Sequence, residues 1–414
     1  MDIISIIFWT GNTISFLTFR GGENSLYWHR FVFKALQIFL GPVLVRKLNY
    51  SYEKVKPSGY PYIILANHNT DYDPFLVGMA FPHHMYYVAS EHIFRWGFVS
   101  RLINFLVAPI PRVKGTTEIY TAINILKRLK DGANVCMFAE GNRSFSGETN
   151  RIHPSTGKLV KKSGVNLITF RFDGGYFTSP RWSKTIRRGM MKGRMVREYS
   201  AEELKKMTWE EINEAVQNDL YVNAYEEQKK NPIEYKGEKL AENLETALYL
   251  CPKCGGTETL KSEDDRFYCS CGLDLRYNTY GYFVSNNNEK PPFETVLEWY
   301  RYQEKYLMDN MEKIRNYPSD RLIYSDEEQT LWKAAWGKKN SLIGKGKLLL
   351  YNDRLVFDCT DKKYVFELKD IMDLGIIGQK VIAFATNDRQ AYEIKSERPR
   401  SALKYREMIK YLKN

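Results

Sequence analysis

Short apolar runs alternate with helical segments between residues 61 and 200, and this alternation constrains the fold more than any other feature. Four runs have the length and the Ile, Val, Phe and Tyr content of buried strands, namely residues 62–66, 85–89, 134–139 and 166–172. Helical periodicity lies between them, over residues 91–106 and 116–130. The pattern predicts an α/β domain with a mainly parallel central sheet flanked by helices, which we place at residues 49–235. In such sheets the chemistry gathers at the carboxyl ends of the strands.

A histidine and an aspartate follow the first of these strands, in the sequence ANHNTDYD at residues 66–73. A histidine acts as a general base near neutral pH when a carboxylate holds its second ring nitrogen. Four intervening residues allow the chain to turn back and bring Asp73 to the ring of His68, while Asp71 is a competing carboxylate that we rank lower. By itself this spacing is weak evidence, because a histidine and an aspartate five residues apart often occur by chance in an ordinary polar loop.

A second polar turn follows the strand at residues 134–139 and reads Glu140-Gly141-Asn142-Arg143-Ser144. Glycine permits a tight turn, and the guanidinium of Arg143 offers paired donors that suit a phosphate. Arg112 ends another apolar run and adds a second cation. Taken alone, these residues also fit a surface turn with a salt bridge.

Taken in order, these segments resemble the glycerolipid acyltransferase family typified by lysophosphatidic acid acyltransferases. The family's first block, Asn-His-x-Ser/Thr-x-x-Asp, is matched in full by residues 67–73. Its block Phe-Pro-Glu-Gly-Thr-Arg-Ser is matched by residues 138–144, with Ala139 in place of proline and Asn142 in place of threonine. The block that ends in arginine is approximated by residues 108–112, where Pro111 replaces the usual aspartate. The resemblance covers about residues 40–200.

The resemblance implies an enzyme that moves a fatty acyl group from acyl-CoA or acyl-carrier protein to a hydroxyl of a lysophospholipid, first of all lysophosphatidic acid. By this likeness His68 is the general base, Asp73 orients it, and no catalytic cofactor is needed. The acceptor's phosphate and glycerol would be held by a group of residues that lie at strand ends, namely Arg112, Glu140, Gly141, Asn142, Arg143 and Ser144.

Four of the six cysteines lie within residues 251–271, as CPKC and CSC. Such a cluster is typical of metal ligands in a reducing compartment rather than of disulfides. We predict a structural zinc held by four thiolates, Cys251, Cys254, Cys269 and Cys271, in a small zinc ribbon over residues 247–277. The second pair is one residue shorter than the usual spacing, and free or redox-active thiols are the alternative.

The N-terminal residues 1–48 are apolar and aromatic, with no cleavage-site pattern. We expect them to form helices that lie in a membrane interface, over residues 3–19 and 26–48, so that the protein is peripheral or monotopic on the cytoplasmic side. The alternative is a helix pair that packs on the domain's own core. A formal charge of +12 favours anionic partners such as membrane lipids.

The C-terminal part changes from helical to alternating periodicity. We expect a helical linker over residues 278–340 and then several antiparallel strands closed by one helix, over residues 341–414. This β-rich arrangement resembles a pleckstrin-homology (PH) or GRAM-type domain. For the zinc ribbon and this PH-like domain we expect a protein or lipid partner.

Two other classes of function remain open from the sequence. A non-catalytic lipid-binding scaffold would need the acyltransferase residues to be degenerate, and the retained His68 and Asp73 count against it. A nucleic-acid-binding zinc ribbon would suit the positive charge, but residues 257–267 between the cysteine pairs are not basic.

Overall fold

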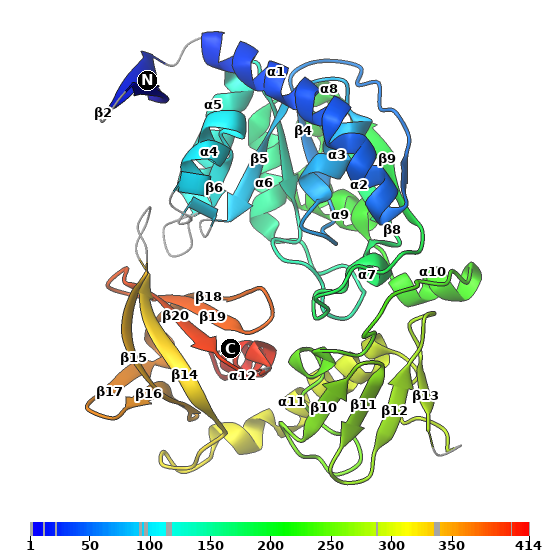
Figure 1. Cartoon of the computed structure of the whole chain (residues 1–414), viewed down its shortest axis with the longest axis vertical. Helices are drawn as coiled ribbons and strands as arrows, with labels where there is room; N and C mark the ends of the chain where they lie inside the picture. Colours follow the sequence, from blue (N-terminus) through cyan, green and yellow to red (C-terminus); the bar gives the residue numbers. More distant parts are fainter. Residues whose placement is uncertain are drawn as a thin grey trace.

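The computed structural model describes residues 3–10, 13–20, 23–90, 93–94, 98–112, 118–286, 289–334, 340–398 and 400–413. Figure 1 shows an α/β domain above two β-rich units that lie side by side beneath it. The long helix α11 (Val296–Arg315) joins these two units.

A seven-stranded sheet forms the centre of the α/β domain, with the order β3-β9-β8-β4-β7-β5-β6. Neighbouring strands run parallel except for β8 and β9, which are antiparallel. The predicted mainly parallel sheet is therefore confirmed, and all four expected strands are present. The strands are β3 (Tyr50–Tyr52), β4 (Tyr62–Ala66), β5 (Met85–Ser90), β6 (Ile110–Arg112), β7 (Asn134–Phe138), β8 (Asn166–Asp173) and β9 (Met191–Tyr199).

Helices cover both faces of this sheet, as the apolar runs require. On β4, Tyr62, Ile64 and Ala66 face one buried cluster, whereas Ile63 and Leu65 face another. A strand that buries both of its faces has a continuous apolar sequence rather than an alternating one. The helices of the domain are α3 (Asp73–Ala80), α4 (Phe98–Val107), α5 (Glu118–Lys130), α6 (Pro154–Ser163), α7 (Gly175–Thr178), α8 (Ala201–Lys206), α9 (Trp209–Leu220) and α10 (Ala224–Lys230).

The N-terminal segment differs from the expectation in its first half. Strands β1 (Ile3–Thr10) and β2 (Thr13–Arg20) form an antiparallel hairpin, so the helix expected over residues 3–19 is wrong. The segment is rich in Ile, Thr and Phe, which favour strands over helices. Residues 26–48 are helical as expected, in α1 (Glu23–Phe39) and α2 (Gly41–Leu48). Among the helices that the structure describes, none has the length and apolarity to cross a bilayer.

The cysteine unit is a four-stranded antiparallel sheet in the order β10-β11-β12-β13. Its strands are β10 (Leu260–Glu263), β11 (Arg266–Cys269), β12 (Asp274–Tyr277) and β13 (Phe283–Ser285), preceded by the short helix η2 (Leu244–Thr246). The unit therefore continues beyond the expected boundary at residue 277.

The C-terminal unit is a curled seven-stranded antiparallel sheet in the order β17-β16-β15-β14-β20-β19-β18. Its central strand β14 lies within residues 278–340, so the expected helical linker is correct only for α11. The elements of the unit are β14 (Tyr324–Ala334), β15 (Ser341–Leu350), β16 (Arg354–Cys359), β17 (Lys363–Glu367), η3 (Leu368–Asp370), β18 (Ile371–Ile377), β19 (Val381–Thr386), β20 (Ala391–Ser396) and α12 (Ala402–Lys413).

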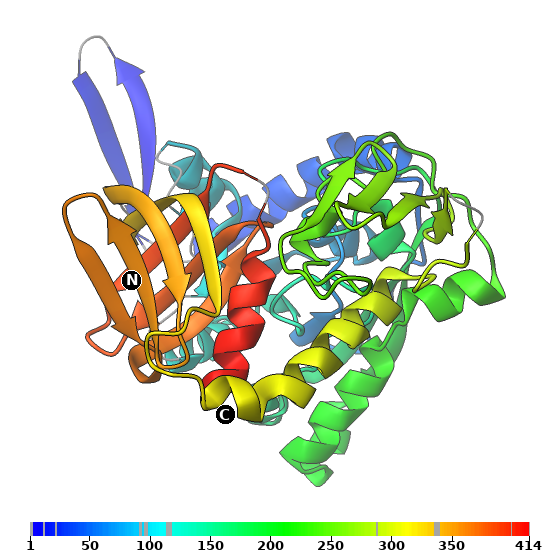
Figure 2. The ribbon, with the colours of Figure 1, turned by 90° about the horizontal axis from the view of Figure 1, so that it is seen from below.

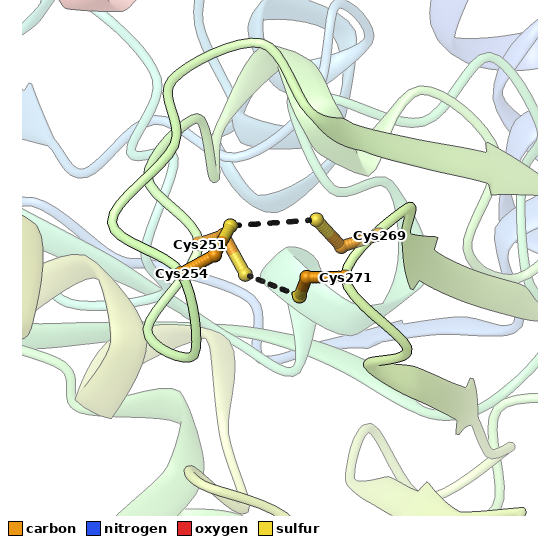
Figure 3. A group of neighbouring side chains, drawn as sticks. All are labelled: Cys251, Cys254, Cys269 and Cys271. Atoms are coloured by element: carbon orange, nitrogen blue, oxygen red, sulfur yellow. Dashed lines mark hydrogen bonds between the residues drawn. The ribbon is translucent and has the colours of Figure 1, made fainter.

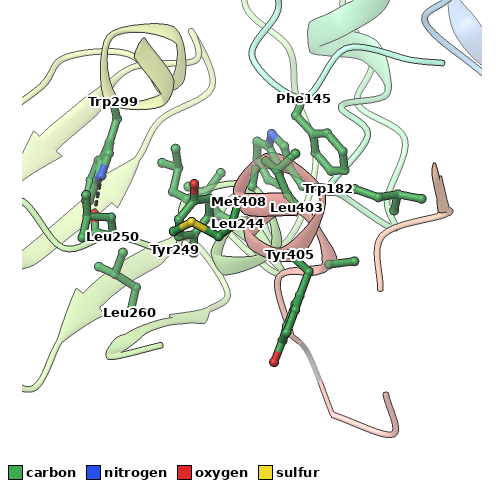
Figure 4. Close-up of a cluster of buried hydrophobic side chains, with 14 of the residues drawn as sticks. Phe145, Trp182, Leu244, Tyr249, Leu250, Leu260, Trp299, Leu403, Tyr405 and Met408 are labelled. Atoms are coloured by element: carbon green, nitrogen blue, oxygen red, sulfur yellow. Dashed lines mark hydrogen bonds between the residues drawn. The ribbon is translucent and has the colours of Figure 1, made fainter. Parts of the chain in front are cut away.

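One continuous hydrophobic core connects all three units. It contains Phe145 and Trp182 from the α/β domain, Leu250 and Trp299 near the cysteine unit, and Leu403 on α12. Figure 4 shows α12 in the middle of this core, with side chains from the other units around it. The view from below in Figure 2 likewise places α12 beside the C-terminal sheet and next to α11. The units are therefore packed together rather than strung on linkers.

Candidate active site

The predicted His68–Asp73 pair forms at the carboxyl end of β4. Nδ1 of His68 lies 2.8 Å from Oδ2 of Asp73, and the imidazole stacks on the ring of Phe138 with the ring centroids 4.4 Å apart. The side chain of His68 is 22% exposed, whereas that of Asp73 is fully buried. A buried carboxylate on Nδ1 leaves Nε2 as the ring nitrogen that can take a proton from a substrate.

Hydrogen bonds from the surrounding loop hold Asp73 in place. Its Oδ2 also accepts from the backbone N–H groups of Asn69 (2.6 Å) and Thr70 (3.0 Å), and Oδ1 accepts from the hydroxyl of Thr70 (2.7 Å). Asp73 is the first residue of α3, where the helix dipole favours a negative charge. The side chain of Asn67 exchanges two hydrogen bonds with the backbone of Phe172 and so ties the end of β4 to β8.

Glu140 lies directly beneath the His68 loop, because β4 and β7 are neighbours in the sheet. Its Oε1 accepts from the backbone N–H of His68 (2.9 Å), and Oε2 accepts from the backbone and side chain of Asn150 (2.8 and 3.0 Å). Burial raises the pKa of Glu140 to about 7, although these hydrogen bonds lower it. All of these contacts are with the protein, so in this structure Glu140 positions the His68 loop.

Arg143 contacts the same loop through Asp71. Its Nη1 lies 3.2 Å from Oδ1 of Asp71, and its Nη2 donates to the carbonyl (2.5 Å) and hydroxyl (3.1 Å) of Ser179. The side chain of Arg143 is 14% exposed, whereas that of Asp71 is 86% exposed. Asp71 therefore does not compete with Asp73 for His68, in agreement with its lower rank as a partner. It is instead a weak surface ion-pair partner of Arg143.

The other predicted site residues surround this turn. Arg112 is exposed at the end of β6 and donates from Nη1 to the carbonyl of Gly141 (3.3 Å). Gly141 has a φ of 69°, a conformation that favours glycine. The carbonyl of Asn142 accepts from the Asn150 side chain, and the hydroxyl of Ser144 accepts from the backbone N–H groups two and three residues ahead. Ser144 thus shapes the turn.

A comparison with protein-family models matches residues 47–173 to the family described as "Acyltransferase". The matched segment contains the His68–Asp73 pair and the turn with Arg143. Residues 47–173 therefore form an acyltransferase-like domain. The matched range is shorter than the domain expected at residues 49–235, and it excludes the cysteine unit and the C-terminal sheet.

No protein of curated function matches the sequence. Among solved structures, the 1-acyl-sn-glycerophosphate acyltransferase of Thermotoga maritima aligns with 49% of this chain and 80% of its own, at 18% identity and a TM-score of 0.40. The 8S snRNP assembly intermediate (16% identity, TM-score 0.20) and the C-terminal domain of an unknown protein from Leishmania infantum (13%, TM-score 0.15) each cover 23% of this chain and 84% of their own. Each likeness is too low to carry a conclusion.

Several residues of the acyltransferase site carry no clear signal in the sequence. Asn150 and Ser179 hold Glu140 and Arg143, yet neither lies in a motif of the resemblance. Asn67 and Thr70 do lie in the first block. Only the structure shows that the Asn67 side chain bonds to the backbone of Phe172 and that the Thr70 hydroxyl donates to Asp73. A short polar residue beside the predicted general base His68 is the signal that could have found these two.

The four predicted zinc ligands converge at one point (Figure 3). Their sulfur atoms all lie within 4.8 Å of one another, with Cys251–Cys271 at 3.7 Å and Cys254–Cys269 at 3.8 Å. Zn–S bonds of about 2.3 Å in a tetrahedron require sulfur–sulfur distances of about 3.8 Å. The residues therefore fit a four-thiolate metal site. Cys136 and Cys359 lie in strands β7 and β16, away from this cluster.

A cavity of about 390 Å³ lies elsewhere, between the cysteine unit and the C-terminal sheet. Its lining includes Glu258, Asp326 and Arg400 and none of the residues of the acyltransferase site. Acidic and basic side chains line this cavity and form ion pairs with one another. The cavity is therefore not the candidate active site.

Proposed function

We propose that this enzyme transfers a fatty acyl group from the thioester of acyl-CoA or acyl-carrier protein to a hydroxyl of a lysophospholipid, with lysophosphatidic acid as the first acceptor to test. The observation that carries the proposal is the contact of 2.8 Å between His68 and the fully buried Asp73. An imidazole oriented by a carboxylate is a general base, and the chain needs no nucleophile of its own because the acceptor supplies one.

The reaction proceeds through one attack on the thioester. Nε2 of His68 takes the proton of the acceptor hydroxyl as the oxygen bonds to the thioester carbon. The tetrahedral intermediate then expels the sulfur, the C–S bond breaks, and His68 returns the proton to the leaving thiolate. Asp73 stabilises the imidazolium that exists between these two steps and keeps Nδ1 as the donor. The products are the esterified lipid and the free thiol.

The phosphate of the acceptor is the group that Arg143 and Arg112 suit. Asp71 is highly exposed and contacts Arg143 at 3.2 Å, so an acceptor phosphate can displace its carboxylate at low cost. Arg112 contacts the Gly141 turn through the carbonyl of Gly141 (3.3 Å), and we propose it as a second cation for the same phosphate. A held phosphate turns the attack into a positioned one, which contributes up to about 7–11 kcal/mol in favourable cases.

A membrane surface is the source of both lipid substrates in this proposal. Helix α1 exposes Tyr27, Phe31 and Phe39, and the neighbouring helix α4 exposes Phe98 and Val99. The two helices are joined by the Trp28 indole, which donates to the carbonyl of Phe105 (3.0 Å). Aromatic side chains that protrude from adjacent helices are typical of proteins bound at a lipid interface. We therefore propose a peripheral or monotopic membrane protein.

A structural zinc in the cysteine unit is part of the same proposal. Four thiolates would fill all positions of a tetrahedral ion, which leaves none for catalysis. The ion would fix the turns before β10 and after β11 in a unit whose sheet is small. The PH-like assignment of the C-terminal sheet stays a prediction.

The experiment is an acyl-transfer screen with purified full-length protein and labelled acyl donors. Lysophosphatidic acid, glycerol 3-phosphate and other lysophospholipids are offered in vesicles, with acyl-CoA and acyl-carrier protein as alternative donors. We expect ester formation that disappears in His68→Ala while the thermal unfolding midpoint stays close to that of the wild type. A fully active His68→Ala variant contradicts the mechanism, and a wild type inactive with every pair supports the non-catalytic scaffold instead.

A further inference from the structure

A turn of the C-terminal sheet reaches back to the acyltransferase domain. It connects β18 to β19 at residues 378–380 and contacts the segment that follows α7, at residues 179–182. The two segments are almost 200 residues apart in sequence. Figure 1 shows the β18–β19 end of the C-terminal sheet directed toward the α/β domain.

Arg181 is the centre of this contact. Its residue is 8% exposed, and its guanidinium donates from Nη2 to the carbonyl of Ile376 (3.0 Å) and from Nε to that of Gly378 (3.3 Å). The guanidinium also lies over the ring of Phe145, 4.2 Å from its centroid. Burial, with the nearby Arg406 and Arg143, lowers the pKa of Arg181 to about 9, so the group is still cationic at neutral pH.

Gln379 makes the complementary contact, from the C-terminal sheet to the segment at residues 179–182. Its Nε2 donates to the carbonyls of Arg181 (3.3 Å) and Trp182 (2.6 Å). Arg181 and Gln379 thus hydrogen-bond to the backbone of each other's segment. We name this reciprocal arrangement the 181–379 clasp.

The clasp holds the backbone of Arg143 as well. Nη1 of Arg181 donates to the carbonyl of Arg143 at 2.8 Å. Two residues before Arg181, the carbonyl and hydroxyl of Ser179 accept from the guanidinium of Arg143. The segment at residues 179–181 therefore fixes both the main chain and the side chain of Arg143.

If this contact served only to hold the two units together, we would expect apolar side chains rather than a buried guanidinium. A buried guanidinium is costly unless hydrogen bonds compensate it, and apolar side chains of similar volume join two surfaces at least as well. Arg181 instead directs its donors at three carbonyls in two units, one of which belongs to Arg143. Among the residues that the structure describes, the exposed Asp71 is the one ion-pair partner of the Arg143 side chain.

We infer that the 181–379 clasp positions Arg143, so that docking of the C-terminal sheet sets the affinity of the site for the phosphate of the acyl acceptor. The inference rests on the proposed function, in which Arg143 binds that phosphate. Arg181 and Gln379 are positioning residues that act through Arg143 and do not touch the substrate. The C-terminal sheet thereby becomes part of the acceptor site.

Gln379→Ala tests the clasp with little disturbance, because Gln379 is half-buried in a turn. Gln390→Ala is the matched control, since Gln390 lies in the next turn of the same sheet and its Nε2 also donates to two carbonyls, those of Ala334 (3.3 Å) and Ala391 (2.9 Å). Steady-state kinetics on full-length protein should give an acceptor KM about three- to tenfold higher for Gln379→Ala, as expected for two lost hydrogen bonds. The KM for the acyl donor and the kinetics of Gln390→Ala should stay near wild type.

A double-mutant cycle decides whether the effect passes through Arg143. In an Arg143→Ala background, Gln379→Ala should cause no further rise in the acceptor KM, because the group it positions is gone. A purely structural role predicts the same rise in both backgrounds, and that additive result would overturn the inference. An unchanged acceptor KM in an active Gln379→Ala enzyme would overturn it too. Failure of the proposed function is a separate outcome, in which the wild type transfers no acyl group.

Discussion

Replacement of Asp73 by Asn is the sharpest test of the proposed general base. The amide keeps the size of the carboxylate, and its oxygen can take the place of Oδ2, which accepts from His68 and from the backbone N–H groups of Asn69 and Thr70. The hydroxyl of Thr70 can rotate and accept from the new NH₂ group. The change therefore removes a negative charge while the local geometry can persist. Asp73→Ala would instead leave several buried donors unpaired, at about 1–3 kcal/mol each.

The size of the effect follows from the distance between the two groups. Unit charges 2.8 Å apart interact by about 6 kcal/mol at an effective dielectric constant of about 20. A neutral hydrogen bond, about 0.5–1.5 kcal/mol, remains in the Asn variant, and the site adjusts in part. We expect a net loss of about 3–4 kcal/mol in the transition state, where the imidazole of His68 is protonated. That loss lowers kcat by about 10²–10³-fold.

The assay measures kcat at saturating acyl donor and lysophosphatidic acid, with thermal unfolding recorded for each variant. Asp219→Asn is the matched control, because the carboxylate of Asp219 also accepts two hydrogen bonds, from Thr169 and Tyr199, at a distance from the site. The control should keep a near wild-type kcat. A kcat for Asp73→Asn within threefold of the wild type would refute the reasoning.

Three further changes probe other parts of the molecule. Asp71→Asn should lower the KM for a phosphate-bearing acceptor two- to threefold (roughly the worth of a surface ion pair), because Arg143 loses a competing carboxylate; a higher KM would count against the phosphate site. Purified protein should hold about one zinc per chain, and Cys254→Ser should lower both the zinc content and the unfolding midpoint, whereas a metal-free folded wild type would rule the ion out. Burial lowers the pKa of His29 to about 4 and that of His84 to about 3, so below about pH 6.5 the unfolded chain takes up protons that the folded chain refuses. The free energy of unfolding should therefore fall by about 1.4 kcal/mol per pH unit for each histidine between pH 6.5 and pH 4, and urea titrations of His84→Gln should give a shallower fall than the wild type.

The sequence was sufficient to predict the contact between His68 and Asp73 and the cluster of four cysteines. His68 and Asp73 are separated by four residues, and such short spacings restrict the geometry strongly. Cys251 and Cys254 are similarly restricted, and the hairpin of β10 and β11 brings the second pair to them. The buried strands were also evident, because a strand with two covered faces is apolar throughout.

Long-range contacts account for what the sequence could not provide. Nothing near Arg181 in the chain indicates that its partners are the carbonyls of Ile376 and Gly378. The role of Glu140 depends on the pairing of β4 with β7, which sets its carboxylate under the backbone of His68. The apolar content of residues 3–19 suggests a membrane-interface helix, whereas their β-branched residues favour strands. In the structure these residues form strands.

The shared hydrophobic core limits how this chain can be divided into fragments that fold alone. Phe145 and Trp182 are covered by residues from beyond position 240, so a fragment limited to the α/β domain would expose part of its own interior to water. Units that bury one another's apolar side chains are coupled in unfolding, because opening one unit exposes the interior of the other. The two β-rich units can therefore not be removed or exchanged as independent modules. Around Trp182, the α/β domain and the two β-rich units therefore share one interior and behave as one folding unit.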